Sequence, residues 1–353
     1  MRPRQLAASS IPAQSAECYK LGLVMKIFSP VLLLLPTATL PLLAAEKITT
    51  DPPKLVAETG AREGPSWDPF TGILYFVSGN NVNRLTPEGR VEPFRTDAPG
   101  ANASMVDPQG RVLACEATGR RVTRTEKDGT LTVIADNYEG KKLNSPNDLA
   151  LDSKGRLYFT DPRYGRTDNM EIKDDSGQLV EGVYRVDFPG KDAPAKTVRI
   201  ITHEVERPNG ILVSPDDKYL YIADNYNNRA GGARKLYRFD LRPDGTIDPA
   251  SRKPIFDWKT ARGPDGFKMD RKGRLYVAAG RNKPSQFETA DEFKGGLYIL
   301  SPEGRLLEFV PFEKDETTNC AFGGKDLKTL FVTAGNQLWS VPVSTPGRIS
   351  AQR

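Results

Sequence analysis

Short apolar runs that each follow a tight turn recur six times along the chain. The turns are rich in Asp, Pro, Gly and Lys, which is the composition of β-hairpin connections. The six segments are WDPFTGILYFVS from Trp67, VDPQGRVLACE from Val106, LDSKGRLYFTD from Leu151, VSPDDKYLYIAD from Val213, MDRKGRLYVAA from Met269 and GGKDLKTLFVTA from Gly323. Equivalent positions, which lie 38, 45, 63, 55 and 55 residues apart, are Tyr75, Leu113, Tyr158, Tyr221, Tyr276 and Phe331.

A second hairpin follows most of these segments, so each unit holds about four strands. Repetition of such a unit at this period is typical of a propeller, and six units predict an all-β, six-bladed β-propeller with four-stranded antiparallel blades. The last unit is short, since only QLWSVPV follows its first hairpin. We therefore expect Lys54 to Glu58 to supply its outer strand and hide the free edges. Two separate β-sandwiches are the alternative, but no linker divides the chain.

One polar position recurs in all six units, five residues before the first residue of the turn. A carboxylate or a carboxamide occupies it every time, in Glu63, Asn102, Asn147, Asn209, Asp265 and Asn319. This position opens the innermost strand of each blade, and innermost strands line the central channel of a propeller. The six side chains are therefore expected to form a ring at one end of the channel.

The chemistry of this ring favours a bound cation in the central channel. Converging carboxylates and carboxamides need water or an ion among them, because they would otherwise repel one another or lack partners. Oxygen donors favour a hard cation, and Ca²⁺ suits a flexible oxygen shell better than Mg²⁺, although other divalent ions fit the same donors. A channel that is merely hydrated is the alternative. It explains the polarity, but not why the ring contains no Ser, Thr, Lys or Arg.

The N-terminal segment has the pattern of an export signal. Lys26 precedes an uncharged apolar stretch that ends in the small residues Ala44 and Ala45, as in a secretory signal peptide. We expect residues 25–45 to be a cleaved signal and 46–353 to be a single propeller domain. Residues 1–24 are then a non-native or disordered extension upstream of Met25. A transmembrane anchor is the alternative; export predicts a periplasmic or secreted protein with no stable membrane association after cleavage.

Charge and residue counts exclude several classes of function. The formal charge is +5, but residues 1–45 hold four basic residues and one acidic residue, so the remainder has 46 basic and 44 acidic side chains, or +2. This balance argues against nucleic-acid binding. The single histidine, His203, excludes a multi-histidine zinc site. Beyond the leader, Cys115 and Cys320 could pair, but we expect both to be small buried hydrophobes.

At the ring residues the chain resembles the SMP-30/gluconolactonase/LRE-like family, and within it the bacterial gluconolactonase branch. The resemblance covers residues 54 to 343 and all six units in order. The matching motifs are REGPSWDP around Glu63, LNSPNDLALDSKGRLYFTDPRYG from Leu143, RPNGILVSPDDKYLYIAD from Arg207, GPDGFKMDRKGRLYVA from Gly263 and TNCAFGGKDLKTLFVTAG around Asn319. This resemblance implies a calcium-dependent lactonase that takes a small sugar lactone as its substrate.

The resemblance also implies roles for individual residues. In that family one Glu and three Asn or Asp side chains hold the divalent ion, and the matching residues are Glu63, Asn147, Asn209 and Asp265. Asp265 matches the residue that deprotonates the attacking water, while the ion polarises the lactone carbonyl. Asp148 is the second candidate for the base, although an extended strand would point it away from Asn147.

Substrate contacts are expected from residues on and beside the ring. The candidates are Asn102, Asn147, Asn319 and Arg163. Asn102 opens NAS where relatives usually have NG, and Asn319 stands either behind the metal ligands or facing the substrate. Three long connections, 162–182, 225–234 and 281–295, are expected at the same end of the channel, with side chains suited to a polyhydroxylated or anionic ligand.

Three functions stay open when the residues are considered without the resemblance. The first is a sugar lactonase. The second is another metal-dependent hydrolase on the same scaffold, such as a phosphotriesterase-like enzyme, because one fold hosts many chemistries. The third is a non-catalytic propeller that binds a ligand and uses calcium structurally. A serine hydrolase is disfavoured, because the sequence has no nucleophile-elbow motif.

Overall fold

The structure, a computed structural model, describes residues 47–164, 167–188 and 195–349. All of them belong to the second of the two units into which the chain divides, Glu46–Arg353. The expected upstream extension, residues 1–24, and the expected signal peptide, residues 25–45, lie outside the described residues. Within the described ranges, no helix has the length and apolar character needed to cross a membrane.

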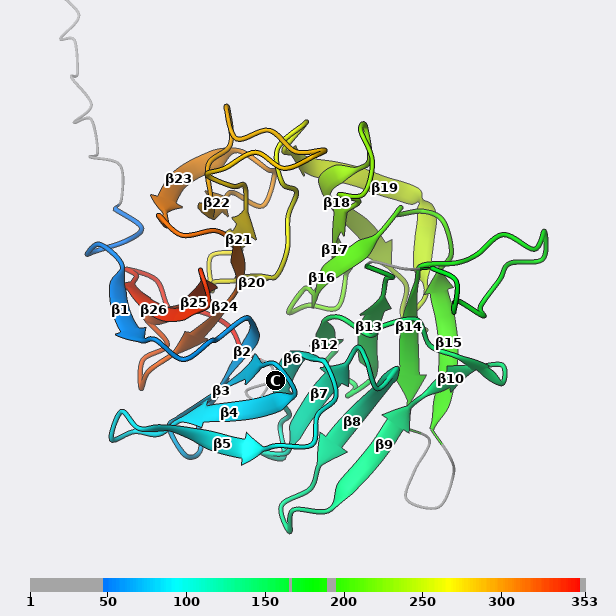
Figure 1. Ribbon diagram of the computed structural model, residues 1–353, viewed down its shortest axis with the longest axis horizontal. Helices are drawn as coiled ribbons and strands as arrows, with labels where there is room; N and C mark the ends of the chain where they lie inside the picture. Colours follow the sequence, from blue (N-terminus) through cyan, green and yellow to red (C-terminus); the bar gives the residue numbers. More distant parts are fainter. Residues whose placement is uncertain (1–46, 165–166, 189–194, 350–353) are drawn as a thin grey trace, which may run out of the picture. The chain divides into compact units, whose positions relative to one another are not determined.

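Six four-stranded antiparallel sheets follow one another around a common axis, so this unit is a six-bladed β-propeller, as the sequence repeat predicts (Figure 1). Blade 1 comprises β2 (Glu63–Asp68), β3 (Ile73–Ser78), β4 (Asn81–Leu85) and β5 (Val91–Arg95). Blade 2 comprises β6 (Ala101–Val106), β7 (Val112–Glu116), β8 (Arg121–Thr125) and β9 (Leu131–Ala135). Blade 3 comprises β12 (Leu149–Leu151), β13 (Leu157–Asp161), β14 (Gly182–Asp187) and β15 (Lys196–Ile201).

The second half of the ring repeats the same order from the innermost strand outward. Blade 4 comprises β16 (Pro208–Val213), β17 (Tyr219–Asn225), β18 (Arg234–Leu241) and β19 (Ile247–Asp257). Blade 5 comprises β20 (Phe267–Met269), β21 (Leu275–Ala279), β22 (Gly296–Leu300) and β23 (Leu306–Pro311). Blade 6 comprises β24 (Thr317–Gly323), β25 (Thr329–Ala334), β26 (Gln337–Pro342) and β1 (Lys54–Ala57), and a small ribbon of β10 (Asn137–Tyr138) and β11 (Lys141–Lys142) leads from blade 2 to blade 3.

The first strand of the described chain completes the last blade. β1 pairs antiparallel with β26, with Lys54 opposite Ser340 and Leu55 opposite Trp339. This pairing confirms the expectation that the segment from Lys54 supplies the missing outer strand. Ile48, just before β1, is buried in the same apolar cluster as Val343, which anchors the closing segment to the core of blades 5 and 6.

A repeated aspartate turn fixes the register of the inner hairpins of blades 2, 3 and 5. In blade 2, Asp107 Oδ1 accepts hydrogen bonds from the backbone N–H groups of Gln109 and Arg111, both at 2.9 Å, and Oδ2 accepts one from Arg111 Nε at 2.6 Å. The same three bonds form at Asp152 in blade 3 and at Asp270 in blade 5. An aspartate that bonds to the backbone two and four residues later determines the turn, and hence which residues open the innermost strand.

The hydrophobic core lies between neighbouring blades. Strands such as β7, β13 and β21 are buried on both faces, because each blade packs against the blade before it and the blade after it. Cys115 and Cys320 are buried and unpaired, in agreement with their interpretation as small hydrophobic residues.

At the turn end of the channel, Arg348 and Ile349 lie among the residues that line a small cavity. This cavity is distinct from the polar cavity that the ring residues line.

Candidate functional site

Five of the six ring residues line one cavity of about 500 Å³ at the end of the channel. They come from five different blades: Glu63, Asn102, Asn147, Asn209 and Asp265. Other polar residues complete the wall, among them Arg62, Tyr164, Asn225, Asn227, Arg262, Asp315, Glu316, Thr318 and Asn336. Ring residues as far as 202 positions apart in the sequence, Glu63 and Asp265, thus share one polar cavity.

The ring residues stand at equivalent places, although two of them precede their strands. Asn147 and Asp265 lie two residues before β12 and β20, rather than in the strands as expected. Their backbones still pair with the second strand of the blade, because Asn147 N–H donates to Thr160 O at 2.9 Å and Asp265 N–H donates to Ala278 O at 2.8 Å. The equivalence therefore comes from this pairing.

Glycines directly after three ring residues allow neighbouring blades to approach at the axis. A Cβ on Gly210 would lie 2.2 Å from Asp265 O, and a Cβ on Gly266 would lie 1.9 Å from Asn319 Cγ. Gly64, after Glu63, is in the same situation against the backbone of the next blade. Such distances are far below van der Waals contact, so only glycine lets the ring side chains come this close.

Buried carboxylates hold the loops that lead to Asn147 and Asn209. Asp161, at the end of β13, accepts the N–H groups of Asn144 and Ser145, both at 2.8 Å. Asp224 in β17 accepts two backbone N–H groups in the same way before Asn209. Burial raises the pKa of Asp161 to about 7, although the two N–H donors act in the opposite direction. These second-strand carboxylates therefore position the ring from behind.

Two of the carboxylates that line the cavity, Glu63 and Asp265, belong to the ring. Burial, followed by the nearby charge of Asp265, raises the pKa of Glu63 well above its usual value. Burial also raises the pKa of Asp265, to about 6, although Arg262 acts in the opposite direction. Two desolvated carboxylates that disfavour each other's ionisation are the arrangement that a cation would relieve.

Arg262 is a site residue that the sequence did not reveal. It is buried, forms an ion pair with Asp265 Oδ2, and donates to Thr317 O at 3.0 Å. It lies three residues before Asp265, outside both the recurring ring position and the hairpin pattern. Only its spacing from Asp265 could have indicated it, and an arginine three residues away in a loop has no fixed direction.

Asn319 and Asp148 are placed differently from the other candidates. Asn319 is buried behind the ring, where its Nδ2 donates to Glu63 Oε2 at 3.1 Å. Lys268 Nζ donates to Asn319 Oδ1 at 3.3 Å. Asp148 lines a separate cavity of about 80 Å³ further along the channel, and its buried Oδ2 has no hydrogen-bond partner. The structure therefore brings Asn319 into contact with a ring carboxylate and places Asp148 on the far side of the ring.

A second cavity of about 310 Å³ adjoins the first and contains the predicted Arg163. The two share Asn102, Asn147 and Tyr164 in their linings. Asn209 Nδ2 donates to Tyr164 Oη at 2.8 Å, and Asn102 Nδ2 donates to Asn147 O at 3.3 Å. The carboxamides are thus held by neighbours, and the two cavities form one continuous polar region around Asn147.

The donor set fits a divalent cation through oxygen atoms of mixed type. In the part of the chain that the structure describes, no group of three or more His, Cys, Asp or Glu side chains is suited to a metal. The ring instead combines two carboxylates with carboxamides, which are ligands for a hard ion such as Ca²⁺. Glu63, Asn147, Asn209 and Asp265 are the residues that would hold it.

The sequence profile described as the SMP-30/Gluconolactonase/LRE-like region matches residues 61–336. The chain belongs to this family. A gluconolactonase from Zymomonas mobilis is 31% identical over 289 residues, which cover 80% of this chain and 72% of that protein. A regucalcin from Xenopus laevis is 26% identical over 280 residues, which cover 77% of this chain and 82% of that protein.

A solved structure of a related protein agrees with the fold. A gluconolactonase from Xanthomonas campestris superimposes with a TM-score of 0.68 at 27% identity, and the match covers 84% of this chain and 91% of that chain. Membership of the SMP-30/gluconolactonase family confirms the predicted resemblance. The gluconolactonases among its relatives confirm the expectation of an enzyme that hydrolyses lactones.

Proposed function

We propose that the chain hydrolyses sugar lactones at a divalent-ion site formed by Glu63, Asn147, Asn209 and Asp265, and that the ion is Ca²⁺. The observation that carries this proposal is the convergence of these four side chains, from four blades, on one cavity of about 500 Å³. Similarity to gluconolactonases supports the substrate class, and similarity to regucalcin supports a divalent ion.

The bound ion would supply Lewis acidity, which polarises the lactone carbonyl and stabilises the negative charge that develops on it. The protein supplies the base. Asp265 lines the cavity, and Arg262 engages only its Oδ2, so Oδ1 stands outside that ion pair. A carboxyl with a pKa of about 6 is mostly ionised at neutral pH and can accept a proton from water. Asp148 lines the smaller cavity instead, which supports Asp265 as the base.

The wall of the cavity suits a polyhydroxylated ring. Arg62, Asn227, Thr318 and Asn336 offer both hydrogen-bond donors and acceptors around its mouth. The adjoining cavity, with Arg163, would take the rest of a substrate whose carbonyl lies at the ring. Asn102 lines both cavities, so we propose that it contacts the sugar between them.

Titration of acid release tests this function directly. Purified protein is treated with chelator, and hydrolysis of glucono-1,5-lactone is followed in a pH-stat before and after addition of Ca²⁺. We expect hydrolysis to stop without the ion, to return with it, and to fall at least about 100-fold in Asp265→Asn. Turnover of an organophosphate ester but not the lactone, or lactone hydrolysis that ignores the chelator, would contradict the proposal.

We also propose that the protein is exported to the periplasm or the medium. The uncharged segment after Lys26 and the Ala44–Ala45 exit support a signal peptide. N-terminal sequencing of the protein made by cells should begin near Ala45 or Glu46. A mature protein that retains Met25 would contradict the proposal.

A further inference from the structure

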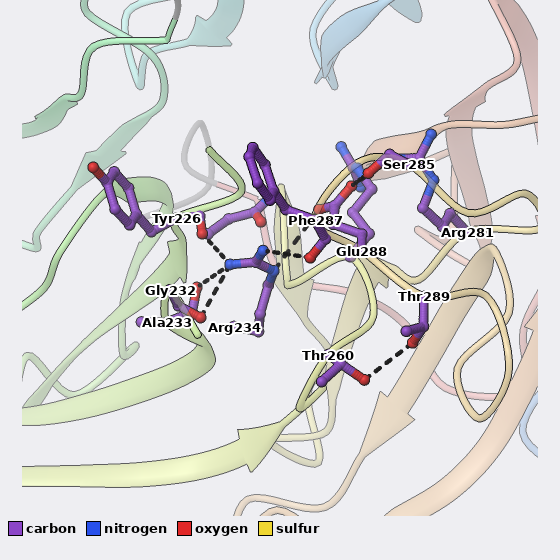
Figure 2. A network of polar contacts seen from close by, with 12 residues as sticks. Tyr226, Gly232, Ala233, Arg234, Thr260, Arg281, Ser285, Phe287, Glu288 and Thr289 are labelled. Carbon is purple, nitrogen blue, oxygen red and sulfur yellow. Dashed lines mark hydrogen bonds and ion pairs between the residues drawn. The ribbon is translucent and has the colours of Figure 1, made fainter. Parts of the chain in front are cut away.

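Two long connections at the ring end of the propeller are tied together by one buried arginine. Arg234, the first residue of β18, donates through Nη1 to Gly232 O at 3.0 Å and to the carbonyl of Tyr226 (Figure 2). Its Nη2 donates to Phe287 O at 3.4 Å, in the connection between β21 and β22. A single guanidinium thus closes the β17–β18 connection and binds it to the next blade.

Glu288 extends this contact toward the site. Its Oε1 lies 3.8 Å from Arg234 Nε, and both side chains are 2% exposed. Its Oε2 lies 2.5 Å from Arg281 Nη1 and accepts a hydrogen bond from Ser285 Oγ at 3.1 Å (Figure 2). Because a buried carboxylate needs compensating charge, Glu288 fixes Arg281 in place.

The charges continue without a break to the candidate base. Arg281 Nη1 lies 3.8 Å from Glu316 Oε1, and Glu316 Oε2 lies 3.6 Å from Arg262 Nε. Arg262 in turn forms the ion pair with Asp265. Six side chains of alternating sign therefore connect the two connections to the site: Arg234, Glu288, Arg281, Glu316, Arg262 and Asp265. We call this set the charge chain.

Glu316 is the point at which the charge chain can shift. It stands between two arginines at 3.6 and 3.8 Å, both beyond hydrogen-bond distance, and its side chain is 41% exposed. Loss of one arginine would let Glu316 close on the other, because an unbalanced charge moves toward its remaining partner. A closer Glu316 would draw Arg262 away from Asp265.

We propose that Arg281 is a positioning residue, which holds Glu316 back from Arg262 and so keeps Arg262 on Asp265. This inference rests on the proposed function, because it concerns the charge of the proposed metal site. In the wild type, Arg262 stays on Asp265 and reduces the negative charge at that site. In a chain without Arg281, Arg262 neutralises Asp265 less, so Asp265 attracts a cation more strongly. The connection itself keeps a second anchor, since Asp315 accepts the N–H groups of Asn282 at 2.8 Å and Lys283 at 3.0 Å.

Calcium titration of the chelator-treated full chain by calorimetry tests this proposal. We expect Arg281→Met to bind Ca²⁺ about three- to tenfold more tightly than the wild type, and Arg281→Lys to return to the wild-type Kd. A merely loosened connection would weaken binding or leave it unchanged. Lys259→Met is the matched control, because it removes the same charge from an exposed pair with Glu292 beside the same connection. Its Kd should stay within about twofold of the wild type.

A double-mutant cycle separates the charge chain from simple loss of a distant charge. In a Glu316→Gln background, Arg281→Met should change the calcium Kd by less than about twofold, because the shared carboxylate is gone. Three results would overturn the proposal. Arg281→Met could leave the calcium Kd of the wild-type chain unchanged, it could change the Kd equally in the Glu316→Gln background, or Lys259→Met could change the Kd by the same amount. A wild type that binds no Ca²⁺ would instead refute the metal site, and this inference with it.

Discussion

Replacement of Gly210 by alanine tests the claim that close packing of blades positions the ring. The added Cβ would lie 2.2 Å from Asp265 O and 3.0 Å from Phe267 Cδ1. Ordinary contact begins near 3.4 Å, so the backbones of blades 4 and 5 must separate by about 1 Å at the axis. Gly210 has an ordinary backbone φ, so the whole effect is steric.

The separation predicts two measurable losses. Overpacking of this kind costs about 1–3 kcal/mol of unfolding free energy, which urea denaturation would measure. Asn209 and Asp265 stand on opposite sides of the contact, so a shift of about 1 Å moves two proposed ligands apart. We expect the calcium affinity to fall about 10- to 100-fold in a calorimetric titration.

A glycine elsewhere in the propeller provides the control. A Cβ on Gly296, in β22, would lie 2.4 Å from Val310 O, which is a clash of similar size outside the ring. Gly296→Ala should lose comparable stability and keep the wild-type affinity for Ca²⁺. Equal affinities in the two variants, or normal stability of Gly210→Ala, would refute the reasoning.

Three further predictions address the residues behind the ring and the closure of the propeller. Asn319→Ala removes the donor to Glu63 Oε2 and should weaken calcium binding about 10-fold by calorimetry; unchanged affinity would contradict that role. Ile48→Ala should cost about 2–5 kcal/mol in urea unfolding, since Ile48 is buried beside the closing strand, and a cost under about 0.5 kcal/mol would show that this segment does not anchor the ring. The pKa of Asp161 rises from 3.8 to about 7 on folding, so the folded state binds the extra proton between these values and wild-type stability falls as pH rises through this window. The free energy of unfolding of the wild type, measured relative to that of Asp161→Asn, should fall by at most about 1.4 kcal/mol per pH unit between pH 5 and 7. A difference between the two proteins that does not change with pH in urea unfolding would contradict this.

The repeat made the fold predictable from the sequence. The aspartate turns are local, since the side chain of Asp107 bonds only to residues two and four positions later, and in blades 2, 3 and 5 they lie at a fixed offset from the ring residue. Closure by β1 was predictable as well, because blade 6 lacked an outer strand and an unpaired edge had to be covered.

The surroundings of the ring could not be predicted in the same way. Arg262 and Glu316 belong to different blade connections and meet only because the propeller brings them to one end. Their positions depend on loop paths, which carry no period and few local signals. The separation of Asp148 from the ring cavity could be predicted from the sequence, because neighbouring side chains in an extended chain point in opposite directions.

The most direct test of the account is a crystal structure of the chain grown with Ca²⁺. The account predicts one ion at the ring, with oxygen atoms of Glu63, Asn147, Asn209 and Asp265 at about 2.3–2.6 Å. A ring that holds only water at saturating Ca²⁺, or an ion bound away from these four side chains, would contradict it.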